Sequence, residues 1–213
     1  MQKTPKTDIG KIINYIRNIS LSRLLLSFMH NGYLLEIGWF ESLKRKECID
    51  ENGEPIPWAP YPYINFLKDY LNEKMTVFEF GSGYSTLFFS NRVKKVFCVE
   101  HDLDWVTKLK LDKKDNIIVF NKKLDIEYEE TLLTIDEKLD LIVIDGRRRV
   151  NCIKIAANKI QGDGLIVLDD SDRIEYQDGI NHLINLGFKK INFTGISPLA
   201  FINRKTTIFF KTF

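Results

Sequence analysis

The sequence lacks the cysteine patterns and the strong net charge that mark several classes of protein. Its three cysteines, Cys48, Cys98 and Cys152, lie far apart and form neither a CxxC motif nor a Cys/His cluster, which argues against a disulfide framework and a zinc site. We interpret them as free thiols in a reducing compartment. With 31 Lys and Arg against 29 Asp and Glu, the net charge is only +2, so no nucleic-acid partner is expected.

The sequence also lacks a long apolar run. Near its beginning the longest is the three leucines at 24–26, between Arg23 and Ser27, and no cleavage-site pattern follows. A membrane-spanning helix needs about 20 apolar residues. We therefore expect a cytoplasmic protein without stable membrane insertion.

Apolar residues recur at spacings of three and four between Ile9 and Met29, which predicts one or two amphipathic helices. We interpret their apolar stripe as core or as a contact in a homodimer. Basic residues beside the stripe leave a membrane-surface helix as the alternative.

The most informative stretch runs from Val77 to Asp102. A short apolar run, Val77–Phe80, leads into the glycine-rich turn GSGYST at 81–86, and a second apolar run ends at Glu100. This order predicts a strand, a tight loop, a helix and a second strand. The two glycines of the turn let a ligand approach the backbone, and the helix start favours anionic or polar groups. An acidic residue at the end of the second strand can accept hydrogen bonds from two ribose hydroxyls, so we predict a nucleoside-cofactor site.

The length of 213 residues suits one α/β domain with a modest extension. We expect an N-terminal helical extension with a proline-rich strap at 1–72 and a cofactor-binding domain at 73–213. Strands are expected near Thr76–Phe80, Val96–Glu100, Asn116–Asn121, Asp140–Asp145, Gly164–Asp169, Lys189–Gly195 and Thr206–Lys211. Helices are expected near Tyr33–Leu43, Ile64–Leu71, Ser85–Asn91, Leu103–Lys113, Glu129–Thr134, Val150–Ile160 and Ile174–Leu186. This alternation predicts a mostly parallel sheet with helices on both faces, closed by an antiparallel hairpin.

The segment 55–63 contains four prolines and several aromatic residues. Proline fixes its own backbone and restricts the residue before it, so we expect an extended segment without helix. It is interpreted either as a structural strap over the sheet edge or as a wall of the ligand pocket.

Acidic residues follow the apolar runs at several predicted strand ends, where ligands bind in doubly wound sheets. They include Glu79 after the first strand, Glu100-His101-Asp102 after the second, Asp125 after the third, Asp145 after the fourth and Asp169-Asp170 after the fifth. Three arginines at 147–149 follow the fourth strand directly and are interpreted either as a solvated run or as a rim that attracts an anionic acceptor.

The residues Glu79-Phe80-Gly81-Ser82-Gly83 resemble the E/D-x-G-x-G signature of class I S-adenosylmethionine-dependent methyltransferases, and Glu100 is similar to the residue that holds the ribose in that family. The resemblance covers about 76–213. It implies a Rossmann-like, doubly wound, seven-stranded sheet in the order 3-2-1-4-5-7-6 with the last strand antiparallel.

The turn at 83–86 further resembles that of catechol-type O-methyltransferases, in which the residue matching Ser85 helps to bind the methionine carboxylate. That resemblance implies a Mg²⁺ site at Asp145, Asp169 and Asp170. The sequence departs from the pattern twice, because the family has Asn in place of Asp170 and Lys in place of Arg148. The motifs together also look like those of bacterial methyltransferases of unassigned substrate.

We therefore predict an S-adenosylmethionine-dependent methyltransferase that acts on oxygen of a small molecule or saccharide. Asp145, Asp169 and His101 are the predicted catalytic residues. The cofactor-binding residues are predicted to be Glu79, Gly81, Ser82, Gly83, Tyr84, Ser85, Thr86, Glu100, His101, Asp125 and Asp145. One alternative is an NAD-dependent oxidoreductase, which Thr86 disfavours because glycine is the third residue of that fingerprint. The other is a non-catalytic module that binds a nucleoside or cofactor.

Overall fold

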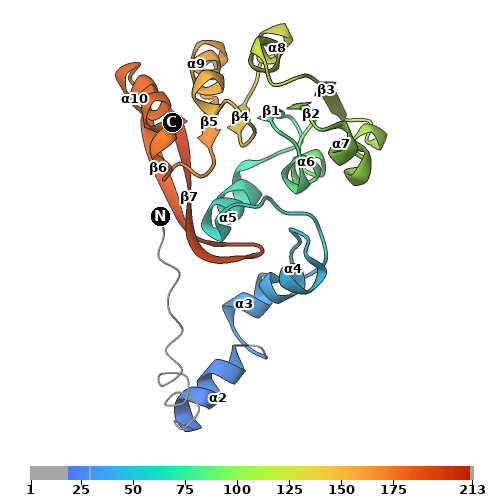
Figure 1. Ribbon diagram of the computed structural model, residues 1–213, viewed down its shortest axis with the longest axis vertical. Coiled ribbons are helices and arrows are strands. Elements are labelled where there is room, and N and C mark those ends of the chain that lie inside the picture. Colours follow the sequence, from blue (N-terminus) through green and yellow to red (C-terminus); the bar gives the residue numbers. More distant parts are fainter. Residues whose placement is uncertain (1–18, 29, 212–213) are drawn as a thin grey trace.

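A single mixed sheet organises the chain, and the computed structural model describes it within residues 19–28 and 30–211. The seven strands lie in the order β3-β2-β1-β4-β5-β7-β6 (Figure 1). Their bounds are β1 Thr76–Phe80, β2 Lys95–Glu100, β3 Ile117–Asn121, β4 Leu141–Ile144, β5 Leu165–Leu168, β6 Lys189–Ser197 and β7 Ala200–Phe210. The first five strands are parallel, and β7 is antiparallel to both of its neighbours. The predicted sheet order and the antiparallel hairpin are confirmed.

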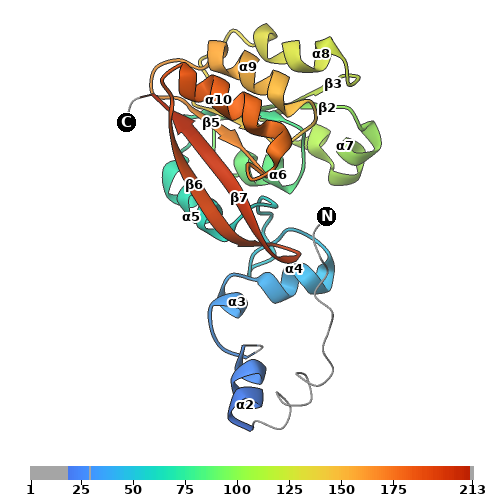
Figure 2. The ribbon, with the colours of Figure 1, turned by 60° about the vertical axis from the view of Figure 1, so that its left-hand side comes forward.

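Helices cover both faces of the sheet (Figures 1 and 2). Their bounds are α2 Ile19–Ser27, α3 Tyr33–Glu36, α4 Trp39–Arg45, α5 Tyr61–Tyr70, α6 Tyr84–Ser90, α7 Leu103–Leu109, α8 Ile126–Glu130, α9 Arg149–Lys159 and α10 Gln177–Asn185. Short 3-10 helices occur at Leu111–Lys113, Thr131–Thr134 and Ile174–Tyr176.

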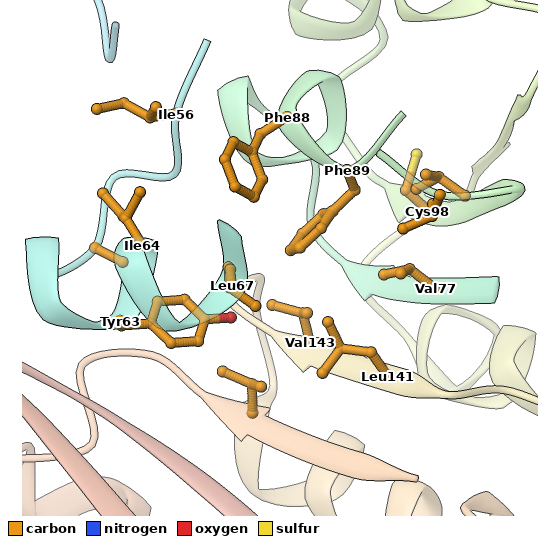
Figure 3. Packing of buried hydrophobic residues seen from close by; sticks show 14 of the residues in the cluster. Ile56, Tyr63, Ile64, Leu67, Val77, Phe88, Phe89, Cys98, Leu141 and Val143 are labelled. Atoms are coloured by element: carbon orange, nitrogen blue, oxygen red, sulfur yellow. The ribbon is translucent and has the colours of Figure 1, made fainter. Parts of the chain in front are cut away.

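The core consists of two apolar layers, one on each face of the sheet. Side chains alternate along a strand, so Val77 of β1 points into one layer and Phe78 into the other. The first layer packs the sheet against α4, α5 and α6, with Phe88 and Phe89 fully buried (Figure 3). The second packs it against α8, α9 and α10. Because both faces are covered, β1, β4 and β5 are buried along their whole length and read as nearly continuous apolar runs.

The segment predicted as one helix at Tyr33–Leu43 forms two helices, α3 and α4, which are separated at Gly38. Gly38 has a φ of +73°, in the left-handed region that favours glycine. A Cβ atom there would lie 2.2 Å from the backbone carbon of Asp50. The break therefore arises from a backbone contact between segments that the helical periodicity does not reveal.

Replacing Gly38 with alanine is expected to lower the free energy of unfolding by about 3 kcal/mol, which combines left-handed strain of about 1–2 kcal/mol with overpacking of about 1–3 kcal/mol. Gly162 is the matched control, because its φ is +59° but no atom lies within 4 Å of the position that a Cβ atom would take. Gly162→Ala should lose only about 1 kcal/mol. Urea unfolding of both variants measures the difference, and equal losses would contradict the packing argument.

The proline-rich segment differs from its prediction at one end. It is non-helical up to Pro60, but α5 begins at Tyr61 and places Pro62 in its first turn. A proline is tolerated there because the first N–H groups of a helix have no intrahelical partner. The expectation of extended chain through Tyr63 was wrong for this reason.

The N-terminal segment is attached to the far end of the sheet. Trp39 is 1% exposed, and its Nε1 donates to the carbonyls of Ser197 at 3.2 Å and Ala200 at 3.4 Å, at the turn between β6 and β7. The indole also packs edge-on against Phe201, with ring centroids 4.4 Å apart. These contacts connect α4 to the hairpin near the opposite end of the sequence.

Of the predicted amphipathic stretch Ile9–Met29, residues 9–18 and 29 lie outside the described residues, and most of the remainder forms α2. Both views place α2 apart from the sheet (Figures 1 and 2). Among the described residues, no helix has the length and apolarity that a membrane crossing requires. The three cysteines are buried free thiols, as predicted.

Candidate active site at the carboxyl ends of the strands

The ends of β1, β2, β4 and β5 meet in a pocket of about 360 Å³. It lies where the strand order reverses between β1 and β4, the usual ligand position in such sheets. Its walls include the predicted residues Gly81, Ser82, Glu100, His101, Asp145, Asp169 and Asp170, together with Trp58, Tyr128, Gly146, Arg147, Arg149, Arg173 and Arg204. The topology thus brings together polar residues from four separate strand ends.

The two glycines of the turn have different roles. Gly81 has a φ of +93°, and a Cβ atom there would lie 3.0 Å from the Cα of Gly146, so packing against the β4 loop requires glycine. Gly83 has an extended backbone, and the nearest atom to its Cβ position is the Ser85 Oγ at 3.8 Å. No contact among the described residues requires glycine at position 83, which leaves room for a ligand against the backbone.

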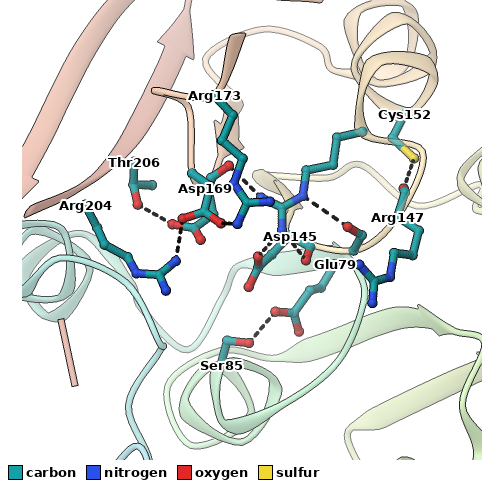
Figure 4. Close-up of polar contacts among 12 residues, drawn as sticks. Glu79, Ser85, Asp145, Arg147, Cys152, Asp169, Arg173, Arg204 and Thr206 are labelled. Atoms are coloured by element: carbon teal, nitrogen blue, oxygen red, sulfur yellow. Dashed lines mark hydrogen bonds and ion pairs between the residues drawn. The ribbon is translucent and has the colours of Figure 1, made fainter. Parts of the chain in front are cut away.

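Glu79 lies beneath the turn and is 1% exposed. Its carboxylate accepts hydrogen bonds from the hydroxyls of Ser85 (Figure 4) and of Thr86, the second at 2.5 Å. Burial raises the pKa of Glu79 to about 7, although both hydroxyls lower it. Thr86 also accepts the Gly83 N–H at 2.9 Å. The threonine that occupies the third glycine's place therefore joins the turn to β1 through hydrogen bonds.

Glu100 ends β2 and is 5% exposed. Its Oε1 accepts the backbone N–H groups of His101 and Asp102, at 2.7 and 3.0 Å, and lies 2.7 Å from the His101 Nδ1. Its Oε2 accepts the Ser82 hydroxyl, at 3.0 Å. A carboxylate has about four acceptor positions, so Oε2 can accept a further hydroxyl.

Several predicted cofactor residues do not line the pocket. Ser85 and Thr86 face Glu79, and Tyr84 is not among the lining residues. Asp125 is exposed and accepts the Glu127 N–H at 2.9 Å, so it caps the start of α8. Asp102 likewise caps the start of α7 through the Trp105 N–H, the common role of an aspartate at a helix start.

Asp145 and Asp169, at the ends of β4 and β5, form the acidic centre of the pocket. Arg149 connects them, since its Nη2 donates to the Asp145 Oδ1 at 2.8 Å and its Nη1 to the Asp169 carbonyl at 2.6 Å. The same guanidinium donates to the carbonyls of Asp145 and Gly146, at 2.9 and 3.0 Å. The Arg149 side chain is only 9% exposed. It therefore connects the two strand ends from a buried position.

The two carboxyl groups have raised pKa values. Burial is the main cause at Asp145, whose pKa rises to about 6 although Arg149 lowers it. Burial and then the charge of Asp145 raise the pKa of Asp169 well above its ordinary value. The Asp169 Oδ1 also accepts the hydroxyl of Thr206 from β7, at 2.5 Å. At neutral pH Asp145 is therefore mostly ionised, and its charge favours the protonated form of Asp169.

Asp170 is held between two arginines. Its carboxylate pairs with Arg173 and with the Nη1 of Arg204, the second at 2.6 Å. The Arg204 guanidinium also lies over the Trp58 ring, 5.3 Å from its centroid. Trp58 therefore makes part of the proline-rich segment a wall of the pocket, which was one of the two interpretations of that segment.

Three site residues were not singled out from the sequence. Trp105 donates through Nε1 to the Ser82 carbonyl at 2.9 Å and steadies the glycine turn from α7. Tyr128 comes from α8, and Arg204 comes from β7. Helical spacing did not indicate the pair of Asp145 and Arg149, because α9 begins at Arg149 and Asp145 lies outside any helix. Arg204 also had no signal in the sequence, because only the register of β7 brings it to the pocket.

No protein-family model matches this chain, and no curated protein sequence does. Solved structures match its fold. A precorrin-8W decarboxylase from Methanobacterium thermoautotrophicum has a TM-score of 0.56 and 17% identity, over 79% of this chain and 98% of that chain. An rRNA methylase from Streptococcus thermophilus has a TM-score of 0.55 and 14% identity, over 70% and 93%. A SAM-dependent O-methyltransferase from Thermotoga maritima has a TM-score of 0.55 and 16% identity, over 85% and 72%.

At these identities the likeness establishes a shared fold. The names of the three proteins refer to different substrates, including a precorrin and an rRNA. The acceptor of this chain must therefore be argued from its own pocket.

Proposed function

We propose that this chain, whose fold is that of the class I S-adenosylmethionine-dependent methyltransferases, is itself such an enzyme and methylates an oxygen atom of a small molecule or saccharide. The observation that supports this most is the carboxyl pair Asp145 and Asp169. It lies in the same pocket as the glycine turn and Glu100 and has the raised pKa values that suit proton transfer.

The β1 and β2 side of the pocket fits the cofactor. Glu100 would accept a ribose hydroxyl at Oε2, and the backbone at Gly83 would approach the amino-acid part, where no Cβ intervenes. S-adenosylmethionine, when bound, supplies an electrophilic methyl group. His101 lies on the Glu100 side of the pocket, so we assign it to the cofactor site and not to proton transfer. The predicted cofactor roles of Tyr84, Ser85 and Asp125 stay predictions.

Asp145 is the proposed general base. A hydroxyl is a weak nucleophile at neutral pH, and its oxygen forms the new C–O bond more readily as it gives its proton to a carboxylate. The methyl group leaves sulfur, which keeps the electron pair of the broken bond, and the acceptor proton ends on Asp145. Arg149 holds the Asp145 carboxylate in place. Positioning of the two reactants supplies much of the remaining rate.

The Mg²⁺ that the catechol-type resemblance implied does not fit these residues. Arg149 pairs with Asp145, and Arg173 and Arg204 pair with Asp170, so guanidinium groups stand where a cation would be expected. Among the described residues there is also no group of three or more His, Cys, Asp or Glu arranged to hold a metal ion. We therefore derive no step through a metal.

Calorimetry with S-adenosylmethionine, S-adenosylhomocysteine and NAD tests the cofactor. Binding of the first two without NAD supports the proposal, whereas NAD binding alone would favour the oxidoreductase. Methyl transfer to a panel of hydroxylated acceptors then distinguishes an enzyme from a binding module.

Removal of metal ions is expected to leave the initial rate of methyl transfer unchanged, because arginines already neutralise the carboxylates. The measurement compares the rate in EDTA with the rate after added Mg²⁺. A catechol-type methyltransferase assayed in parallel shows that the chelator is effective. Loss of activity in EDTA and its recovery with Mg²⁺ would contradict the assignment of these carboxylates to arginine partners.

A further inference from the structure

A second cavity of about 460 Å³ adjoins the pocket. The two share Gly146, Arg147, Arg149 and Arg173, so three arginines stand at the boundary between them. The outer walls of the second cavity come from the start of α9 and from the loop before α10, including Asn151 and Tyr176. An acceptor that reaches Asp145 and extends into the second cavity must pass these arginines.

The three boundary arginines differ in how far the protein already uses them. Arg149 is buried and engaged by four hydrogen bonds. Arg173 pairs with Asp170 and, at 3.9 Å, with Glu175, but its side chain is 46% exposed. Arg147 is exposed, and in the part of the chain that the structure describes its guanidinium forms no hydrogen bond or ion pair. In Figure 4 the dashed line at Arg147 runs from Cys152 to its main-chain carbonyl. Arg147 thus offers a complete guanidinium to a ligand.

The charge of the β4 and β5 side of the pocket is unbalanced. Arg147, Arg149, Arg173 and Arg204 face Asp145, Asp169 and Asp170. Four guanidinium groups therefore face three carboxyl groups, and the raised pKa of Asp169 favours the neutral form of one of the three. The Arg204 Nε is also buried without a hydrogen-bond partner among the described residues. Buried N–H groups normally have a hydrogen-bond partner, so this N–H group can donate to a ligand on this side of the pocket.

We propose that the acceptor is a small acidic molecule whose oxyanion group, a carboxylate, phosphate or sulfate, is bound by Arg147 and Arg173. This inference rests on the proposed methyltransferase function. Guanidinium groups bind such oxyanions through paired hydrogen bonds, and two of them at one passage fix the orientation of the bound molecule. The hydroxyl to be methylated then lies toward Asp145, and the rest of the acceptor occupies the second cavity.

A small molecule fits better than RNA. The net charge of the chain is only +2, and the arginines of this proposal gather around the two cavities. Nucleic-acid binding instead relies on basic residues spread along a surface that follows the phosphate backbone.

The test uses the full chain saturated with S-adenosylhomocysteine, titrated with glucuronate, glucose 6-phosphate and glucose as probes. The two acidic sugars are expected to bind at least about tenfold more tightly than glucose, a factor that corresponds to about 1.4 kcal/mol. Arg147→Met and Arg173→Met should each weaken the acidic sugars by about tenfold and leave the affinity for S-adenosylhomocysteine unchanged. Arg147→Lys should retain part of the affinity. Lys154→Met is the control, because it removes one positive charge from an exposed position of α9 outside both cavities.

Equal binding of glucose and the acidic sugars, or unchanged binding in both arginine variants, would overturn the inference. So would a single-stranded RNA oligonucleotide that displaces the acidic sugars. Failure of the wild-type chain to bind S-adenosylhomocysteine at all would instead reject the proposed function. Binding of S-adenosylhomocysteine to the wild-type chain, measured before any sugar is added, therefore distinguishes a failure of the proposed function from a failure of this inference.

Discussion

Replacing Asp145 with asparagine is expected to lower kcat by about a thousandfold, the middle of the range for loss of a general base. The carboxylate lies in the pocket and, with a pKa of about 6, is mostly ionised at neutral pH. An asparagine keeps the shape and one acceptor for Arg149 but cannot take a proton. The affinity for S-adenosylhomocysteine should change little, because Glu100 and the glycine turn stay intact.

The pH dependence provides the sharper readout. The pKa of about 6 belongs to the unliganded chain, so Asp145 is expected to give wild-type kcat/KM an acid limb, and kcat/KM should fall as the pH drops through 6. That limb should be absent in Asp145→Asn. Stability depends on pH in the opposite direction. Because folding raises the pKa of Asp145 from 3.8 to about 6, its contribution to the free energy of unfolding is present below pH 3.8 and is lost as the pH rises through 6.

Asp178→Asn is the matched control, since Asp178 is exposed on α10 and lies outside both cavities. It should keep the wild-type kcat and pH profile. Urea unfolding of Asp145→Asn establishes that the variant is folded at the assay temperature. A folded Asp145→Asn variant with the wild-type rate and acid limb would remove Asp145 from the role of base.

Replacing Arg149 with methionine is expected to lower the free energy of unfolding by about 3–5 kcal/mol, the usual loss when one partner of a buried ion pair is removed. The guanidinium is 9% exposed and satisfies the Asp145 carboxylate and three main-chain carbonyls. Methionine fills similar volume but offers no donor. The free energy of unfolding of Arg149→Lys should fall between those of the wild type and Arg149→Met, because an ammonium group cannot reach all four acceptors at once.

Arg147→Met is the control for stability, because it is the same substitution two residues away at a guanidinium without a partner in the described chain. It should change the free energy of unfolding by no more than about 0.5 kcal/mol. Chemical denaturation of the three variants gives the comparison. If Arg149→Met is as stable as Arg147→Met, the four hydrogen bonds do not hold the ends of β4 and β5 together.

The parts of the fold predicted from the sequence are those with local patterns. Val77–Phe80 and the turn at 81–86 have a strand pattern and turn chemistry within ten residues, and β1 begins and ends where predicted. The antiparallel hairpin followed from the absence of a helical pattern between the last two strands. The helix break at Gly38 was missed because its cause is a contact with Asp50.

The site was predictable only as far as strand order determines it. Glu100, Asp145 and Asp169 share one pocket because the carboxyl ends of parallel strands meet at one sheet edge. The partners of these residues were not predictable. Asp170 looked like a metal ligand by resemblance, yet Arg204 approaches it from β7, and that approach depends on antiparallel register. Likewise, no local pattern indicates that Thr206 bonds to Asp169.

The position of β7 has a consequence for the order in which the site can form. Although β7 follows all the other strands in the chain, it lies inside the sheet between β5 and β6. During synthesis the ribosome delivers β1 to β5, with Asp145 and Asp169, before it delivers Thr206 and Arg204. Until β7 inserts, Asp169 lacks its hydroxyl partner, Asp170 lacks one of its two arginines, and Trp39 lacks the hairpin carbonyls. Completion of the pocket and anchoring of the N-terminal segment are therefore both late steps that depend on a single strand.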